Sequence, residues 1–403
     1  MRWLGAACAA LVPWAGAGAQ SARPSARLDA SAVAVLTAAG PVPRGGGMAT
    51  ELRIVHPVLM LRAGTAAGGL GLVVTVNVDG WTIPNGELAP GMWGEGFVDR
   101  RHPHTFAHEI MLVARMPVGG SRVTVAAGKG FVPFGTDDPM GRPPLRYPVN
   151  HHLSQILERA VAMVALEHGS LRVEGAVFGG DEPATPRGWP KLDRFGDSWA
   201  ARVTVRPPLP TGAALELQGS HARVHSPEHR DGTGLDQVKW SGSARWTGPL
   251  GPARAYALAE WARTSEAGGA FVYHTALAEA ALESGPHRPY LRIESTERPE
   301  EERVAAYRTV RPLRDDAILG VTRWTIVTLG YGLDLLSGRL RLRPFVEGSL
   351  GGIATVGGGF FDPAVYYGGT TTRAATLGLR VATMPVGHRM GRYADHMEQH
   401  AHH

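Results

Sequence analysis

An alternation of apolar and polar residues recurs from about residue 51 to the C-terminal region, and it constrains the fold more than any other feature. Successive side chains of a β-strand point to opposite faces. In segment 70–79 one face would hold Leu70, Leu72, Val74, Val76 and Val78. The other face would hold Gly71, Val73, Thr75, Asn77 and Asp79. The pattern predicts strands with one aliphatic face and one mostly small or polar face.

Segment 339–348 repeats the pattern with charged residues. One face would hold Arg339, Arg341, Arg343, Phe345 and Glu347. The other would hold Leu340, Leu342, Pro344, Val346 and Gly348. A soluble β-sandwich also alternates, but its apolar face packs on a second sheet and its polar face contacts water. We interpret the pattern as a barrel in lipid, with an apolar outside and a polar lumen.

The strand candidates come in pairs that short turns join. The pairs are 51–62 with 70–79, 106–116 with 121–131, 159–167 with 171–178, 200–206 with 213–224, 237–246 with 253–264, 271–283 with 288–297, and 318–335 with 339–348. A late strand at 373–384 and an early one at 30–38 bring the count to 16. We therefore predict an all-β antiparallel transmembrane barrel of about 14–16 strands, with 12 or 18 as further alternatives.

Long connections separate these pairs, at about 80–105, 132–158, 179–199, 225–236, 298–317 and 349–372. Short turns on one rim and long loops on the other are typical of outer-membrane barrels, whose short turns are periplasmic and whose long loops are extracellular. We expect segment 150–159 to form one or two helical turns, with Asn150 as N-cap, and to fold inward.

The N-terminal segment has the pattern of a cleaved secretory signal. Arg2 precedes an apolar stretch, and Ala17-Gly18-Ala19 has the form of a cleavage site. We predict a signal peptide over 1–19, an N-terminal segment with the first strand over 20–50, the barrel over 51–386 and a His-rich tail over 387–403. The predicted location is the outer membrane of a Gram-negative bacterium. The one cysteine, Cys8, lies in the signal, so a thiolate site is excluded from the mature chain.

Charge and motifs exclude several functions. The net charge of +5 is modest, and no basic run is interleaved with aromatic residues, so nucleic acid is not an expected partner. No uninterrupted apolar run reaches 18 residues. The sequence has no Gly-x-Ser-x-Gly elbow, His-Glu-x-x-His helix or P-loop, so we predict that the protein is not an enzyme. The expected partners are outer-membrane lipid, lipopolysaccharide and small solutes; the sequence does not define an oligomeric state.

The alternation also assigns charged residues to the lumen. The predicted pore-lining set is Arg122, Arg172, Glu174, Arg202, Glu216, Lys239, Arg245, Arg288, Arg292, Glu294, Arg341, Arg343, Glu347 and Arg380. Basic residues outnumber acidic ones. Either Arg and Glu on neighbouring strands pair into a lattice that stiffens the wall, or the surplus Arg favours anions. We expect Trp240, Trp246, Trp261 and Trp324 to form girdles at the membrane interface, although aromatic residues also simply favour strands.

A histidine-rich segment at 99–109 precedes and enters one strand. Its loop motif reads Asp99-Arg100-Arg101-His102-Pro103-His104. His102 and His104, together with His151 and His152 of the next long loop, are candidate ligands for copper or zinc. A salt-bridged loop latch is the alternative interpretation. Strand periodicity places His108 on the lipid side, as an interfacial residue rather than a ligand.

This motif resembles a signature of porin-like outer-membrane barrels of unsettled function, whose relatives often occur near copper-handling systems. Segments 132–135 and 148–152 resemble neighbouring blocks of that group, and 130–135 is also similar to phosphate-selective porins. The resemblance implies a porin-like barrel with a link to copper. In that group an acidic residue follows the second His of the motif, whereas Thr105 stands here.

The C-terminal tail contains four histidines in its last eight residues. His396 and His400 are further candidate ligands for copper or zinc, since short His-rich tracts can hold such ions. Against this, we expect a solvated tail without fixed structure. The function predicted first is a channel for small solutes with an anion bias. The alternatives are a metal-linked binding protein and a structural barrel that does not conduct.

Overall fold

The molecule is described by a computed structural model. It describes residues 25–41, 47–65, 69–82, 105–136, 138–209, 212–301, 314, 318–337, 340–383 and 389–395. The predicted signal over 1–19 and the segment 396–403 lie outside these residues.

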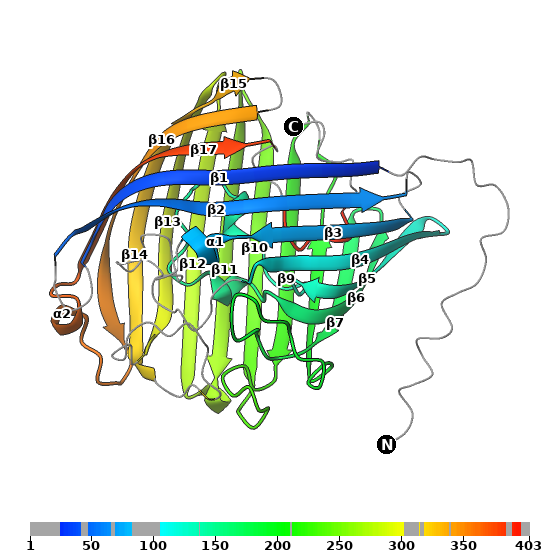
Figure 1. Ribbon diagram of the computed structural model, residues 1–403, viewed down its shortest axis with the longest axis horizontal. Coiled ribbons are helices and arrows are strands. Elements are labelled where there is room, and N and C mark those ends of the chain that lie inside the picture. The colour runs from blue at the N-terminus through cyan, green and yellow to red at the C-terminus, as the bar shows by residue number, and fades with distance from the viewer. Residues whose placement is uncertain are drawn as a thin grey trace.

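The strands form one antiparallel sheet that closes on itself (Figure 1). They are β1 (Ser25–Gly40), β2 (Ala49–Gly64), β3 (Leu70–Asn77), β4 (Ala107–Val118), β5 (Ser121–Gly130), β6 (Arg159–His168), β7 (Leu171–Phe178), β8 (Ser198–Val205), β9 (Ala214–Val224), β10 (Gln237–Leu250), β11 (Ala253–Glu266), β12 (Phe271–Glu283), β13 (His287–Glu301), β14 (Ile318–Leu333), β15 (Leu335–Ser337), β16 (Leu340–Val356) and β17 (Thr371–Ala382). Neighbours in the chain are neighbours in the wall.

Closure comes from β1, which pairs with both β2 and β17. Val33 lies opposite Arg380 across one seam, and Ser25 lies opposite Gly64 across the other. The short β15 follows β14 after Asp334 and pairs with β16, as β14 does, so the two form one interrupted strand. The wall therefore has sixteen strands, which confirms the predicted barrel at the upper end of its expected strand number.

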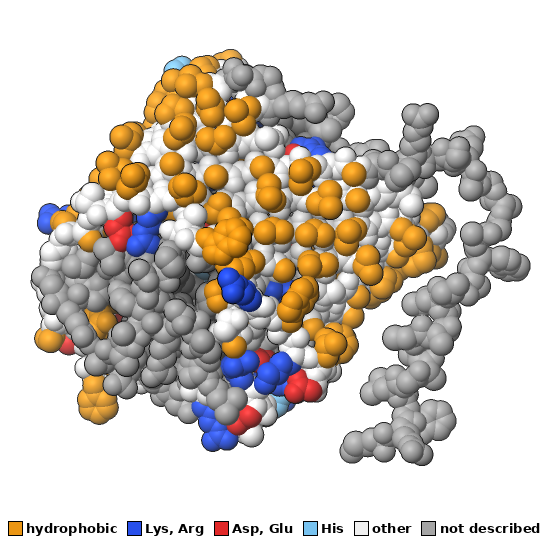
Figure 2. Space-filling view, viewed as in Figure 1, with side chains coloured by type: hydrophobic (Ala, Val, Ile, Leu, Met, Phe, Trp, Pro, Cys, Tyr) orange, Lys and Arg blue, Asp and Glu red, His pale blue; other side chains and the backbone are white. Residues whose placement is uncertain are grey.

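The alternation sorts side chains as predicted. Leu112 and Leu377 point outward, with 67% and 58% of their surfaces exposed, while Thr75 and Asn77 are buried inside. Figure 2 shows apolar side chains spread over the wall that β1, β2 and β3 form. An outer surface of this kind is stable against hydrocarbon. Among the described residues, no helix is long and apolar enough to cross a membrane.

The two rims differ as expected. Turns such as 119–120, 169–170 and 251–252 connect strands at one rim, which we call the short-turn rim. The chain enters β1 at this rim, because Ser25 pairs with Gly64 next to a short turn. At the opposite, long-loop rim lie the short helices α1 (Asp79–Thr82) and α2 (Pro363–Tyr366) and the 3₁₀ turn η4 (Ala267–Gly269).

One of the predicted girdle tryptophans is placed differently. Trp240 and Trp261 face outward, but Trp324 is fully buried on the inner face. Its ring lies under the guanidinium of Arg298, 5.2 Å from the ring centroid, and contacts Tyr367 edge-on. The girdle assignment of Trp324 was wrong because an aromatic residue on a strand suits either face, and inside the barrel its indole N–H donates to Thr322 Oγ1 at 2.9 Å.

Candidate functional site

The lumen is crossed by the connection between β5 and β6, residues 131–158, which we call the β5–β6 loop. Its backbone is bonded to opposite parts of the wall. Gly135 N donates to Ser220 Oγ at 2.9 Å, Leu145 N donates to a Glu347 carboxylate oxygen at 3.0 Å, and Val149 N donates to one of Glu294 at 3.2 Å. The loop contains the 3₁₀ turns η2 (Pro139–Gly141) and η3 (His151–Ser154). The loop folds inward, as the sequence predicted for its part from Asn150 onward.

The predicted turn near residue 150 differs in detail. Asn150 stands at the N-cap of η3 but makes no capping bond with its side chain. Its Nδ2 instead donates to the backbone oxygen of Glu297 at 3.3 Å. The Asn150 side-chain amide is therefore bonded to the wall instead of capping η3, since a buried polar group is stable only with a hydrogen-bond partner.

A buried carboxylate anchors the loop from the other side. Glu260 of β11 accepts hydrogen bonds from Arg142 Nη2 and Ser154 Oγ, both at 2.8 Å, and from Thr136 Oγ1. All three donors belong to the β5–β6 loop. A buried charge is tolerated only when it is paired and hydrogen-bonded. Glu260 therefore requires the loop inside the barrel.

Backbone freedom at one glycine permits this path. Gly135 has φ of +66°. An added Cβ would lie 1.6 Å from the backbone oxygen of Ser154, so no other residue fits without displacing the loop. The carbonyl of Gly135 accepts hydrogen bonds from Gln218 and, at 3.4 Å, from Arg202.

The second element inside the barrel is the C-terminal segment 389–395, which we call the tail segment. Arg389 forms a two-pronged ion pair with Glu216 of β9, at 2.6 and 3.0 Å. Arg392 Nη2 donates to Gln218 Oε1 at 2.7 Å. Tyr393 is buried; its hydroxyl donates to Glu109 at 2.7 Å and accepts from the backbone N–H of Phe131 at 2.9 Å. The expectation of a solvated tail was wrong for these residues, because wall carboxylates and the β5–β6 loop hold them.

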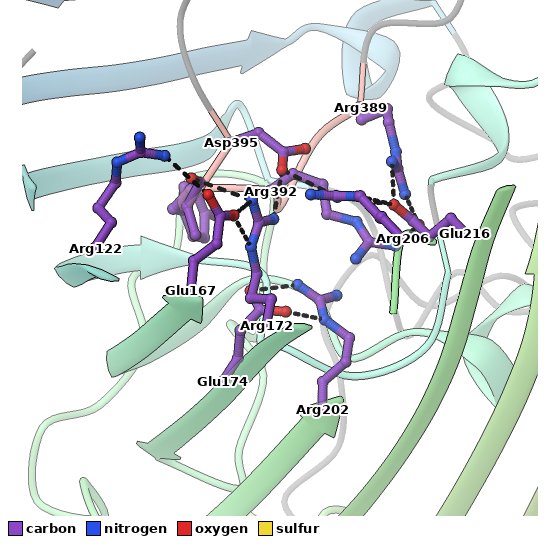
Figure 3. A network of polar contacts seen from close by, with 12 residues as sticks. Arg122, Glu167, Arg172, Glu174, Arg202, Arg206, Glu216, Arg389, Arg392 and Asp395 are labelled. Carbon is purple, nitrogen blue, oxygen red and sulfur yellow. Dashed lines mark hydrogen bonds and ion pairs between the residues drawn. The ribbon is translucent and has the colours of Figure 1, made fainter. Parts of the chain in front are cut away.

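An arginine cluster surrounds the end of this segment (Figure 3). The carboxylate of Asp395 pairs with Arg172 of β7 and, at 3.2 Å, with Arg206, which follows β8. Arg115 Nη2 donates to the backbone oxygens of Tyr393 and Asp395, at 2.7 and 3.3 Å. Burial by itself raises the pKa of Asp395, but the guanidinium groups outweigh it and hold that pKa well below its usual range.

The wall carries a lattice of further ion pairs. Arg202 of β8 donates two hydrogen bonds to the carboxylate of Glu174 of β7, at 2.6 and 2.8 Å. Arg292 of β13 pairs with Glu279 of β12 at 2.7 Å, and both side chains are fully buried. Paired groups of this kind stiffen the wall, which is one of the two roles that the sequence left open for these residues.

Most predicted lumenal residues lie buried on the inner face. These are Arg172, Glu174, Arg202, Glu216, Lys239, Arg292, Glu294, Arg343, Glu347 and Arg380. Four more are only partly buried: Arg122, Arg245, Arg288 and Arg341. The loop and the tail segment cover much of this face, so the set meets protein groups rather than open solution in this conformation.

His108 was placed on the wrong face. It is fully buried, and its Nδ1 lies 2.6 Å from Glu158 of the β5–β6 loop. The register of β3 against β4 shifts between Thr75 and Val76, so that both His108 and Glu109 are buried inside. A β-bulge of this kind breaks the two-residue period on which the sequence argument depended.

The metal-ligand candidates are only partly described. His151 is buried in η3, 5.0 Å from the Tyr147 ring and 4.5 Å from the ring of His152. His102, His104, His396, His400 and the loop motif 99–104 lie outside the described residues. Within the part of the chain that the structure describes, no group of three or more His, Cys, Asp or Glu side chains could hold a metal ion.

Two kinds of functional residue escaped prediction from the sequence. Glu260 and Glu279 share their strand faces with Thr264 and Thr275 but also with Leu258 and Leu277, so the alternation of apolar and polar residues is a weak signal for them. Asp395 carried no such signal, because its partner Arg172 is 223 residues away in the chain.

The apolar groove on the wall is separate from this site. It has a volume of about 660 Å³ and lies among outward residues of β1, β14, β16 and β17, including Leu36, Leu329, Val346 and Leu377. These side chains face away from the lumen. The groove therefore belongs to the lipid-facing surface.

Comparison with known proteins identifies the fold. No family model and no curated protein matches the chain. Among solved structures, an anion-selective porin from Comamonas acidovorans is 12% identical, with 89% of this chain and 100% of that chain covered and a TM-score of 0.52. OmpT (in-vitro folded), an outer membrane protein of Vibrio cholerae, is 12% identical, with 89% and 97% covered and a TM-score of 0.50. OpdK of Pseudomonas aeruginosa with vanillate gives 11% identity, 89% and 98% coverage, and a TM-score of 0.43.

The likenesses to the Comamonas and Vibrio barrels, with TM-scores of 0.52 and 0.50, show the fold alone. Together with the closed sheet and its apolar exterior, they make the chain a porin-like, sixteen-stranded β-barrel of the bacterial outer membrane.

Proposed function

We propose that the protein is a channel for small solutes, rather than an enzyme, and that it favours anions. The observation that carries this proposal is the charge of the inner wall around the tail segment. Among the described residues there, the wall carries seven arginines and five carboxylates. The arginines are Arg27, Arg62, Arg115, Arg122, Arg172, Arg202 and Arg206, and the carboxylates are Asp29, Glu109, Glu167, Glu174 and Glu216.

A surplus of arginine has a definite effect in a lumen. Arginine keeps its charge at every physiological pH. A low-dielectric wall focuses the field of such charges and raises the local concentration of anions. The Comamonas barrel, which shares this fold, is itself an anion-selective porin, which supports the same direction.

The filled lumen supports a channel that is closed in the described conformation. The β5–β6 loop and the tail segment both bind the inner wall through side chains that could exchange partners. A barrel that never conducts is the competing proposal, and it is favoured by the same filling. The metal-linked function stays a separate prediction, and calorimetric titration with Cu(II) and Zn(II) tests it.

Conductance in planar bilayers tests the channel. The full mature chain and a variant that ends at residue 386 are each inserted and exposed to a KCl gradient. We expect single-channel conductance steps that are more frequent in the shortened variant. We also expect a reversal potential whose sign corresponds to chloride selectivity. Arg172→Gln combined with Arg206→Gln should weaken the anion preference, whereas Arg187→Gln in an exposed loop should not. Silence of both chains, or a cation-selective reversal potential, contradicts the proposal.

A further inference from the structure

The tail segment places an anion of the protein's own among wall arginines. Arg172 uses Nε, at 2.8 Å, and Nη2 for Glu167, and turns Nη1 to Asp395. Arg206 donates from Nε to Glu216 at 2.8 Å and from Nη2 to Asp395 at 3.2 Å. Arg172 thus keeps Glu167 and gives Nη1 to the tail, whereas Arg206 Nη2 lies 2.8 Å from Glu216 as well as 3.2 Å from Asp395. In Figure 3 the guanidinium groups of Arg172 and Arg206 both approach Asp395.

If the tail segment left the lumen, a preformed anion-binding site would remain on the wall. The two N–H groups that now bind Asp395 would lose their acceptor, and buried donors without acceptors are costly. The neighbouring wall carboxylates are already engaged: Glu167 by Arg122 at 2.9 Å as well as by Arg172, and Glu174 by Arg202. Glu216 would lose Arg389 with the tail but is already bonded to Arg206, so the acceptor that replaces Asp395 for Arg172 Nη1 would come from a solute.

We propose that Arg172 and Arg206 form a binding site for small carboxylates, and that Asp395 occupies this site as a tethered competitor. The inference rests on the proposed channel function and names the solute class and the regulation of that site. The chemistry is that of guanidinium with carboxylate, whose fork geometries match. The present occupant is itself a carboxylate held by this geometry.

Occupation of the site is coupled to the β5–β6 loop. The hydroxyl of Tyr393 accepts the N–H of Phe131, where the loop begins, and Met390 packs with Phe131 and Leu157 at its two ends. Gly391 makes this approach close: its φ is +71°, and an added Cβ would lie 2.7 Å from Phe131 Cβ. A carboxylate that displaces Asp395 thus also releases contacts that hold the loop across the lumen.

Thiol accessibility tests the competition without requiring conduction. In a Cys8→Ser background, Ala394→Cys places a thiol beside Asp395 at a position that is 3% exposed. The folded barrel in detergent is treated with a small charged maleimide in sodium chloride, phosphate or succinate at equal ionic strength. We expect labelling about threefold faster in about 50 mM succinate than in chloride, since a tethered group competes at an effective concentration in the millimolar range. Phosphate should have a smaller effect.

Two further variants separate the site from general loosening. Adding Asp395→Asn should raise the basal labelling rate and abolish the response to succinate. Arg187→Gln in an exposed loop should leave both unchanged. Labelling that is equal in succinate and chloride overturns the competition, and equal acceleration by phosphate overturns the carboxylate assignment. Either result can arise in a barrel that conducts, and a silent barrel can still respond to succinate, so this test and the conductance test fail independently.

Discussion

At the scale of single residues, the barrel interior depends on buried charges that have partners. Glu260 lies on β11 with three donors from the β5–β6 loop, and Arg292 pairs with Glu279 where neither side chain reaches solvent. A buried ion pair adds little net stability compared with apolar packing, but removal of one partner is strongly destabilising. These residues therefore determine which loop conformation the barrel accepts.

Truncation of Glu260 tests this dependence. Glu260→Ala leaves Arg142 without its closest carboxylate, and we expect the free energy of unfolding to fall by about 3 kcal/mol. Urea titration of the folded barrel in detergent, followed by its heat-dependent gel migration, measures the change. The control is Glu283→Ala, where a half-exposed carboxylate lies 3.7 Å from Arg288. Equal stability of the two variants would show that the loop does not depend on Glu260.

At the scale of elements, the loop and the tail segment convert a wide barrel into a filled one. Neither has regular structure beyond short 3₁₀ turns. Their positions come from bonds to many separate strands, from β4 to β16. The strand ladders do not involve either element, so departure of the tail segment would leave the backbone pairing of the wall intact.

Acid should release the tail segment only at low pH. The pKa of Asp395 lies below its free value, so its contribution to docking is complete above the free pKa, about 3.9, and is lost as pH falls toward the docked value. The charged groups around it are Arg62, Arg115, Arg172, Arg206, Arg389, Arg392, Glu167 and Glu216.

The Ala394→Cys thiol reports this release. We expect constant protection from pH 8 to pH 5 and loss of protection below about pH 4. A pyridyl disulfide reagent, which reacts in acid, gives the rate, and Ser284→Cys in an exposed turn of the short-turn rim corrects for the reagent. An increase in relative accessibility centred near pH 6 would point to a histidine instead of Asp395.

At the scale of the whole molecule, the closed sheet separates two solvents. Outward side chains meet hydrocarbon, and inward ones meet the loop, the tail segment and each other. Closure leaves no strand edge, so all backbone groups of the wall can pair within the sheet, which a lipid environment requires. Closure of the sheet in lipid thus accounts both for the sorting of side chains between the two faces and for the complete pairing of the backbone.

The cost of a charge on the outer wall should depend on depth. Leu377→Arg, near the middle of β17, is expected to destabilise the barrel in lipid vesicles by about 2–4 kcal/mol. Leu171→Arg, at the rim end of β7, should cost about 0–1 kcal/mol. Urea titration of folding into vesicles measures both. Equal costs would mean that the bilayer does not cover these strands as the exposed apolar surface indicates.

The wall of the barrel is predictable from the amino-acid sequence alone. The two-residue period of the sequence predicted the strands, the inward placement of residues such as Arg172 and Glu347, and the contrast between short turns and long loops. That information is local, because each strand shows its two faces within ten residues or so. The two-residue period predicted the wrong face for two residues. At His108 a β-bulge breaks the period and turns the side chain inward. At Trp324 an aromatic side chain is compatible with either face of the strand.

The contents of the lumen, in contrast, follow from the three-dimensional fold. The tail segment and the β5–β6 loop meet wall residues one hundred or more positions away, such as Glu216 for Arg389 and Glu260 for Arg142. A strand pattern constrains which face a side chain takes but not which distant charge it meets. Closure of the sheet decides which distant charges meet, since it brings the carboxylates and arginines of separate strands around one enclosed space.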